Sequence, residues 1–133
     1  MDWSNGTALI TGASSGIGAA TARYLAGHGL RVILVARREE KLLEVQNEIT
    51  QAGGKAKVIQ ADLSVGSERE CVYQEVLDNY GVPDVLINNA GFGWYGYFSD
   101  MPLEVCKAMI DVDLMATVHL TRLFLPEMLK KTQ

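Results

Sequence analysis

The stretch Thr11-Gly12-Ala13-Ser14-Ser15-Gly16-Ile17-Gly18 lies between a short apolar run, residues 7–11, and a helical pattern over residues 16–28. Backbone N–H groups at a helix N-terminus attract a phosphate if no β-carbon blocks its approach. Gly12 would allow the tight turn, Gly16 the close approach of a pyrophosphate, and Gly18 the packing of helix on strand. Ser14 and Ser15 offer hydroxyl donors. An ordinary glycine-rich turn is the alternative, but the position between strand and helix favours a dinucleotide site.

Around this turn, short apolar runs rich in β-branched residues alternate with helical patterns that end at glycines. The predicted strands are residues 7–11, 31–36, 55–61 and 84–88, and the predicted helices between them are 16–28, 39–52 and 67–80. The first, second and fourth runs are nearly continuous, as expected for a parallel sheet that is covered on both faces. Right-handed crossovers then predict an α/β fold with three αβα layers and one parallel sheet in the order 3-2-1-4.

A segment rich in glycine and aromatic residues, 91–101, follows the fourth predicted strand. Its Trp94, Tyr95, Tyr97 and Phe98 either contact a substrate or pack the loop, and the sequence does not separate these two interpretations. A long helix, residues 102–131, is expected next. It opens at Pro102, whose fixed φ suits a first turn, and Pro126 predicts a kink or a break late in the helix.

Composition excludes several classes of partner. Twelve Lys and Arg against 16 Asp and Glu give a net charge of −4 without a basic block, which argues against nucleic acid and anionic membranes. No run is long enough to cross a bilayer and no secretory signal is visible, so the cytoplasm is the expected compartment. Cys71 and Cys106 lack metal-ligand spacing and are expected to be half-buried helix residues. No metal site is expected, and His28 and His119 are assigned to the surface or to an interface.

The end of the second predicted strand bears on cofactor preference. An NAD-binding unit usually places a carboxylate there, on the ribose 2′-hydroxyl, whereas this chain has Ala36 followed by Arg37 and Arg38. A guanidinium can bind a 2′-phosphate through two parallel hydrogen bonds, so NADP(H) is favoured over NAD(H). The alternative is that both arginines are merely solvated at the start of the next helix.

Polar residues also follow the third and fourth predicted strands. Asp62 can accept a hydrogen bond from an adenine amino group, or it can cap the turn that follows. The amides of Asn88 and Asn89 can tie neighbouring strand ends together, and small Ala90 and Gly91 let a ribose pass close to the backbone.

Taken together, the turn at residues 11–18, Asp62-Leu63, Asn88-Asn89-Ala90-Gly91 and the helix segment 109–113 resemble the short-chain dehydrogenase/reductase family in order and spacing. The resemblance covers essentially the whole chain. It implies a Rossmann-like fold and hydride transfer between a nicotinamide ring and a carbonyl or alcohol carbon. It assigns Gly12, Ser14, Ser15, Gly16, Ile17 and Gly18 to the pyrophosphate side, Arg37 and Arg38 to the 2′-phosphate, Asp62 and Leu63 to the adenine, and Asn89, Ala90 and Gly91 to the adenosine ribose.

Two departures from the family pattern concern catalysis. Asp113 stands where the family has a helix Asn that supports a proton relay, and a carboxylate accepts hydrogen bonds without donating them. The family's Tyr-x-x-x-Lys pair is also missing, since no tyrosine of the chain has a lysine four residues later. The chain stops where the family's fifth strand, which bears the catalytic Ser, would be expected to begin. Residues 1–133 are therefore expected to be a single NAD(P)-binding domain that is incomplete relative to the family, truncated before the later strands, and inactive alone.

Three hypotheses follow for function. In the first, the chain is the N-terminal, NADP(H)-binding half of a reductase or dehydrogenase; in the second, it is a non-catalytic dinucleotide-binding or assembly module. Methyl transfer on a related sheet is weakened because Ala36 and Arg37 replace the acid that it would need. The predicted helix 102–131 is apolar on more than one face, so a homo-oligomer formed through it is expected.

Overall fold

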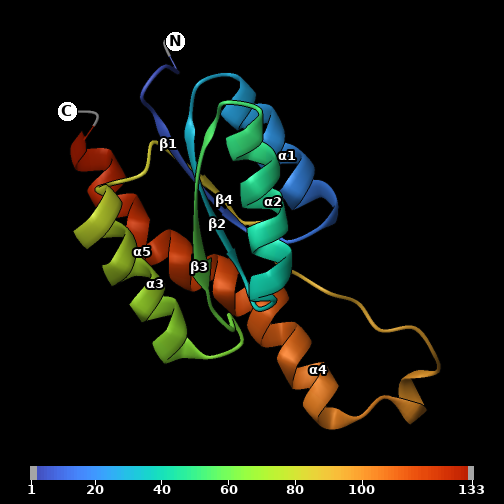
Figure 1. Cartoon of the computed structure of the whole chain (residues 1–133). Coiled ribbons are helices and arrows are strands. Elements are labelled where there is room, and N and C mark those ends of the chain that lie inside the picture. The colour runs from blue at the N-terminus through green and yellow to red at the C-terminus, as the bar shows by residue number, and fades with distance from the viewer. Residues whose placement is uncertain (1–2, 132–133) are drawn as a thin grey trace.

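The computed structural model describes residues 3–131, which form a four-stranded parallel sheet between two layers of helices (Figure 1). The strands are β1 (Thr7–Thr11), β2 (Arg31–Ala36), β3 (Lys55–Gln60) and β4 (Val85–Ile87), in the order β3-β2-β1-β4. Helices α1 (Gly16–Gly27), α2 (Glu39–Gln51) and α3 (Gly66–Tyr80) connect them. The predicted fold class and strand order are confirmed.

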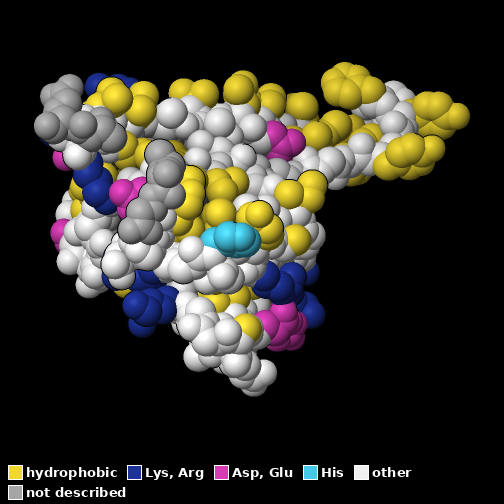
Figure 2. Space-filling model, turned by 90° about the horizontal axis from the view of Figure 1, so that it is seen from above, with side chains coloured by type: hydrophobic (Ala, Val, Ile, Leu, Met, Phe, Trp, Pro, Cys, Tyr) yellow, Lys and Arg dark blue, Asp and Glu magenta, His cyan; other side chains and the backbone are white. Residues whose placement is uncertain are grey.

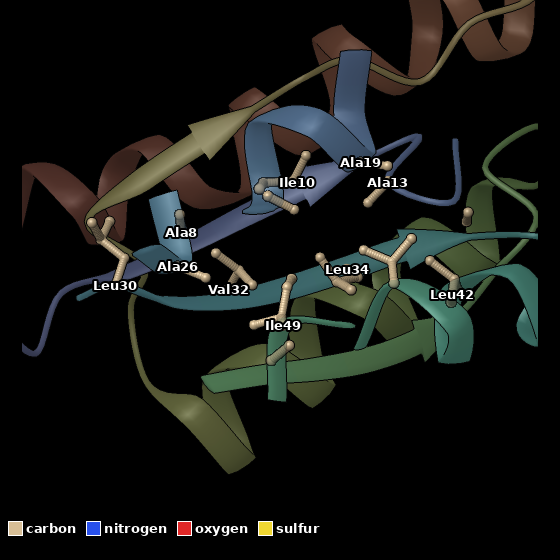
Figure 3. Packing of buried hydrophobic residues seen from close by; sticks show 14 residues of the cluster. Ala8, Ile10, Ala13, Ala19, Ala26, Leu30, Val32, Leu34, Leu42 and Ile49 are labelled. Atoms are coloured by element: carbon tan, nitrogen blue, oxygen red, sulfur yellow. The ribbon is translucent and has the colours of Figure 1, made fainter. Parts of the chain in front are cut away.

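Alternating side chains along the central strands divide the core between the two faces of the sheet. Figure 3 shows one face, where Ala8, Ile10, Val32 and Leu34 of the strands pack against Ala19 and Ala26 of α1 and Leu42 and Ile49 of α2. The other face carries Leu9, Ile33, Val35 and Ile59, which pack against α3 and α5. A fully buried aliphatic side chain contributes about 1.5–3 kcal/mol to stability, so both helix layers are held firmly to the sheet.

β4, at one edge of the sheet, differs from the predicted strand in its burial and its length. All three residues of β4 are half-buried rather than fully buried, because β1 is its only neighbouring strand within residues 3–131. It is also two residues shorter than predicted. Just before β4, the backbone N–H of Asp84 donates a hydrogen bond to the carbonyl of Thr7, and the Asp84 carboxylate accepts one from the N–H of Thr7. The side-chain bond takes the place of a strand-to-strand bond, so the pairing of β4 with β1 begins after Asp84.

The predicted long helix is divided into three parts. It consists of α4 (Leu103–Met109), a π-helical segment η2 (Ile110–Met115) and α5 (Ala116–Lys131). The prediction that the helix opens at Pro102 was wrong by one residue, because Pro102 has an extended ψ of 137° and serves as the N-cap. Pro126 lies inside α5 without ending it, and a short 3₁₀ turn, η1 (Phe98–Asp100), precedes α4.

Candidate functional site

A pocket of about 420 Å³ opens at the carboxyl ends of the strands. Volumes of this size are typical of small-molecule sites. In the sheet, β2 lies on one side of β1 and β4 on the other, so the strand order reverses at β1. The pocket is at this point, which is where open α/β sheets bind ligands. Its walls are Gly12, Ser14, Ser15, Ile17, Ala36, Arg37, Arg38, Ala61, Asp62, Leu63, Asn89, Ala90, Gly91, Phe92 and Val112.

The turn between β1 and α1 depends on its three glycines. Gly12 and Gly16 have φ values of +63° and +56°, in the left-handed region that side chains with a β-carbon rarely adopt. A β-carbon on Gly12 would also lie 2.9 Å from the Cα of Ala90, and one on Gly18 would overlap the carbonyl oxygen of Gly12. The backbone geometry therefore requires glycine at each of these positions.

The start of α1 leaves polar groups directed at the pocket. Ser15 is the N-cap residue, but its side chain makes no capping hydrogen bond. The hydroxyls of Ser14 and Ser15 instead lie 3.4 and 3.3 Å from Nη2 of Arg38, which donates to both. Since the first backbone N–H groups of a helix have no partner within the helix, the turn presents hydrogen-bond donors to a ligand at this edge.

The end of β4 is tied to the same turn by Thr11 and Asn89. The Thr11 hydroxyl accepts hydrogen bonds from the backbone N–H groups of Asn89, at 3.0 Å, and Ala90, at 2.9 Å. The Asn89 amide donates to the carbonyl of Gly12 at 3.2 Å, and the Asn88 amide donates to the Thr121 hydroxyl on α5 at 3.0 Å. Asn89 thus joins neighbouring strand ends, as the sequence indicated, whereas Asn88 joins the strand end to helix α5 instead. The contribution of Thr11 was not foreseen.

Asp62 organises the wall that follows β3. Its Oδ1 accepts hydrogen bonds from the hydroxyl of Ser64 at 2.7 Å and from the N–H of Ser64 at 3.0 Å. The Ser64 hydroxyl lowers the pKa of the Asp62 carboxyl most; partial burial opposes this, and the Ser64 N–H and the charge of Arg37 add to the lowering. The structure thus contains the capped turn that was one interpretation of Asp62, and its carboxylate carries a negative charge at the pocket.

Asp113 lies in the π-helical segment, next to the pocket but not in its wall. Its Oδ1 accepts a hydrogen bond of 2.9 Å from the backbone N–H of Phe92. A β-carbon on Gly91 would lie 3.1 Å from the same oxygen, so the backbone at Gly91 lies close to the Asp113 carboxylate. The carboxylate thus fixes the chain as it leaves β4, by accepting a hydrogen bond that an amide oxygen at this position could also accept.

Every residue predicted to bind the cofactor lies in the pocket wall except Gly16 and Gly18, which shape the turn behind it. Four wall residues were not predicted: Ala36, Ala61, Phe92 and Val112. The two alanines stand at the carboxyl ends of β2 and β3, and small residues at such ends are a signal that could have identified them. Phe92 and Val112 carry no local signal, because only the folded chain brings the loop and η2 to this edge.

The aromatic residues after β4 form an arm that projects from the body of the molecule, and Figure 2 shows hydrophobic side chains over much of it. Trp94 packs over Gly96, where a β-carbon would lie 2.8 Å from its ring, so loop packing holds for this residue. Tyr95, Tyr97 and Phe98 are each more than 80% exposed and none lines the pocket. Loop packing does not hold for these three side chains, and substrate contact stays a prediction for them.

The remaining candidates lie outside the pocket. Cys106 is half-buried as expected, but Cys71 is exposed on α3, which corrects the prediction for that residue. His28 is exposed and bonds the carbonyl of Tyr24, whereas His119 is half-buried against α3. Within residues 3–131, no three His, Cys, Asp or Glu side chains gather in a way that could hold a metal ion. No helix in that range combines the length and apolar character needed to span a membrane.

Comparison with known proteins gives consistent matches. The family model described as short chain dehydrogenase matches residues 6–133. A metagenomic short-chain oxidoreductase solved in complex with NADP superposes with a TM-score of 0.94 and 42% identity, over 100% of this chain and 61% of that one. L-Sorbose reductase from Gluconobacter frateurii, complexed with NADPH and L-sorbose, gives a TM-score of 0.90 and 31% identity over 98% of this chain and 51% of its own.

Among curated sequences, an uncharacterized oxidoreductase of Staphylococcus epidermidis is 36% identical over 125 residues, which are 94% of this chain and 53% of the relative. The chain therefore spans about half the length of the curated relatives it matches.

Proposed function

Because this chain belongs to the short-chain dehydrogenase family, we propose that its pocket binds NADP(H) in preference to NAD(H) and that the whole protein transfers a hydride between this cofactor and a carbonyl or alcohol substrate. The observation that carries the preference is the pair of guanidinium groups at the end of β2. Arg37 and Arg38 both line the pocket, and Arg38 lies within hydrogen-bonding distance of the hydroxyls of Ser14 and Ser15.

The charges around these arginines suit a phosphate. Ala36 occupies the end of β2, where a carboxylate would repel a 2′-phosphate, and Asp62 is the only acidic residue in the described pocket wall. Two guanidinium groups against one carboxylate leave the wall net positive. Charge-assisted hydrogen bonds from a guanidinium to phosphate oxygens are about twice as strong as neutral ones, so the 2′-phosphate is proposed to lie between Arg37, Arg38 and Ser14.

The other walls fit the rest of the cofactor. Gly12 and Gly18 leave no room for a β-carbon beside Ala90 and Asn89, and Gly16 has open space where its β-carbon would stand. The diphosphate is proposed to pass over residues 12–18, with the adenine against Asp62 and Leu63 and its ribose along residues 89–91. The bound cofactor would supply or accept the hydride, while these residues bind and orient it.

One observation favours a second candidate function for the chain by itself. No Tyr-x-x-x-Lys is present among its 133 residues, and Asp113 replaces the amide at the family's Asn position. The chain alone can therefore serve as a non-catalytic dinucleotide-binding or assembly module. Oxidation of NADPH by the purified chain in the presence of simple aldehydes and ketones tests the non-catalytic role: turnover would exclude it, whereas binding without turnover is the result expected of this chain by itself under either candidate.

Cofactor preference is tested by calorimetric titration of the chain with NADP⁺ and with NAD⁺. We expect NADP⁺ to bind about tenfold more tightly, as one or two charge-assisted hydrogen bonds would give. Arg37→Ala and Arg38→Ala should each weaken NADP⁺ binding while changing NAD⁺ binding little. Arg23→Ala is the matched control, because Arg23 pairs with Glu48 away from the pocket. Equal affinities for the two dinucleotides would refute the preference.

A further inference from the structure

A buried arginine connects the pocket wall to the last helix. Arg69 of α3 is only 6% exposed. Its Nη1 donates a hydrogen bond of 2.7 Å to the carbonyl of Leu63, and its Nε donates one of 2.8 Å to Nδ1 of His119 on α5. Leu63 is itself buried and lines the pocket. The position of this wall is therefore linked, through one guanidinium, to an imidazole outside the pocket.

The partners of Arg69 are unusual for a buried cation. Buried charges are normally paired with an opposite charge, because leaving water is otherwise costly. Within residues 3–131, however, no carboxylate oxygen lies within 4.0 Å of the Arg69 guanidinium. The guanidinium donates instead to the backbone carbonyl of Leu63 and to the imidazole of His119. A guanidinium only donates, so Nδ1 of His119 must accept, which requires a neutral ring with its proton on Nε2.

Protonation of His119 would remove this acceptor. Both ring nitrogens then carry hydrogen, so Nδ1–H would face Nε–H of Arg69 and two positive charges would meet in a partly buried site. Glu70 of α3 is the one nearby acid, with Oε1 3.9 Å from Nε2, but its side chain is 68% exposed and solvent weakens the attraction. Arg122, one turn further along α5, adds positive charge.

The other elements packed against α5 do not neutralise this charge. The sheet face in contact with α5 contributes apolar side chains such as Leu9 and Leu86. In η2, the carboxylate of Asp111 is paired with Lys107, and that of Asp113 accepts from the backbone of Phe92. Protonation of His119 therefore acts mainly on Arg69.

We propose that His119 is a proton-sensitive positioning residue: when its ring is neutral it holds Arg69 against the Leu63 carbonyl, and when protonated it releases Arg69 and loosens the Asp62–Leu63 wall. Dinucleotide binding is then weaker at acidic pH. Histidine is the side chain whose ordinary charge change falls between about pH 5 and 8, so binding is compared across that range. This inference rests on the proposed function, since it concerns regulation of the same pocket.

The test compares binding of NADP⁺, which is stable in acid, from about pH 8 to about pH 5.5 in three proteins. His119→Asn places an amide oxygen near the position of Nδ1, so it keeps an acceptor that does not titrate. His28→Asn is the matched control, because the chain has two histidines and the His28 side chain contacts Tyr24, outside the pocket wall. The phosphates of NADP⁺ also titrate, but they do so equally in all three measurements. His119→Asp is a second variant if the first folds poorly, because its carboxylate oxygen also lies near the position of Nδ1 and an aspartate ordinarily stays ionised over this pH range.

On acidification, the affinity of the wild type and of His28→Asn should fall about three- to tenfold more than that of His119→Asn, which corresponds to the loss of one hydrogen bond. Equal pH dependence in the wild type and His119→Asn would overturn the inference. Amide hydrogen exchange of residues 62–69 without ligand provides an independent measurement: protection should fall in the wild type relative to His119→Asn at the same acidic pH. Absence of NADP⁺ binding in every protein at pH 8 would instead overturn the proposed function, and the exchange measurement would still decide whether the link exists.

Discussion

The side-chain amide of Asn89 donates a hydrogen bond of 3.2 Å to the carbonyl oxygen of Gly12. This contact joins the end of β4 to the glycine-rich turn after β1, across 77 residues of sequence. Its geometry is possible only because position 18 is glycine, since a β-carbon there would overlap both the Gly12 carbonyl and the Asn89 amide. The two walls of the pocket are thereby held at a fixed separation.

Loss of this hydrogen bond is expected to affect both stability and binding. Asn89→Ala should lower the free energy of unfolding by about 1 kcal/mol, the usual contribution of one hydrogen bond, and should weaken NADP⁺ binding because the turn loses its support. Asn79→Ala is the control, since Asn79 makes an amide-to-carbonyl bond to Glu75 on the exposed side of α3, away from the pocket. Urea unfolding and calorimetry measure the two effects. Unchanged NADP⁺ affinity in Asn89→Ala would contradict the support role.

Addition of a single methyl group at Gly18 should be strongly disruptive. Gly18→Ala places a β-carbon against the Gly12 carbonyl, so α1 must move away from β1. Overpacking of this kind lowers the free energy of unfolding by about 1–3 kcal/mol, and by more where the turn distorts. Gly27→Ala in the same helix has open space and should be neutral or slightly stabilising. Thermal unfolding of the two variants gives the comparison. Similar stability of the two variants would contradict the prediction that a β-carbon at position 18 cannot be accommodated.

Stability should depend on the ionisation of Asp84. Burial raises the pKa of this carboxyl, but the Lys131 ammonium at 2.7 Å and the N–H of Thr7 at 2.8 Å outweigh it, so the net pKa is lowered on folding. A lowered pKa stabilises the folded state above the pKa of the unfolded chain, about 3.9, and this stabilisation is lost as the pH falls through the folded value. The advantage of the wild type over Asp84→Asn should therefore shrink below about pH 4.

Lys131→Met serves as the control for this prediction, because it removes the ammonium while leaving Asp84 in place. The pH-dependent part of the Asp84→Asn effect should be smaller in the Lys131→Met background. A stability difference between wild type and Asp84→Asn that stays constant down to pH 2 would contradict the assignment.

We expect the chain to self-associate through α5. Val118, Leu125 and Leu129 are about half exposed and line an apolar groove on this helix, and exposed apolar patches of this kind favour association. Leu125→Glu should shift the protein toward the monomer in analytical ultracentrifugation. Leu43→Glu on α2 makes the same change at a residue of similar exposure, 41% against 45%, and should leave the association unchanged. A wild-type chain that sediments as a monomer at all concentrations would rule this surface out.

Local patterns were sufficient for most of the fold. Buried strands and amphipathic helices are recognised by their periodicity, so the order of elements and the strand order β3-β2-β1-β4 followed from the sequence. The ends of elements were less accurate, because hydrogen bonds from distant residues determine them. The Asp84 carboxylate bonds the N–H of Thr7, so β4 begins only at the next residue, and the non-helical ψ of Pro102 delays the start of α4 until Leu103. The π-helical segment 110–115 had no signal in the sequence pattern.

By itself, the sequence determined the glycine-rich turn, the replacement of an acidic residue by Ala36, Arg37 and Arg38, and the end of the strands, the carboxyl end, at which a ligand would bind. Each of these depends on residues that are neighbours in the chain, so their conformational preferences and spacing are sufficient. The tertiary structure alone decided that the Thr11 hydroxyl accepts from the backbone of Asn89 and Ala90, that Phe92 and Val112 line the pocket, and that Arg69 donates to His119. Those contacts join residues that are distant in sequence, and they exist only once parallel strands and packed helices bring the separate segments together.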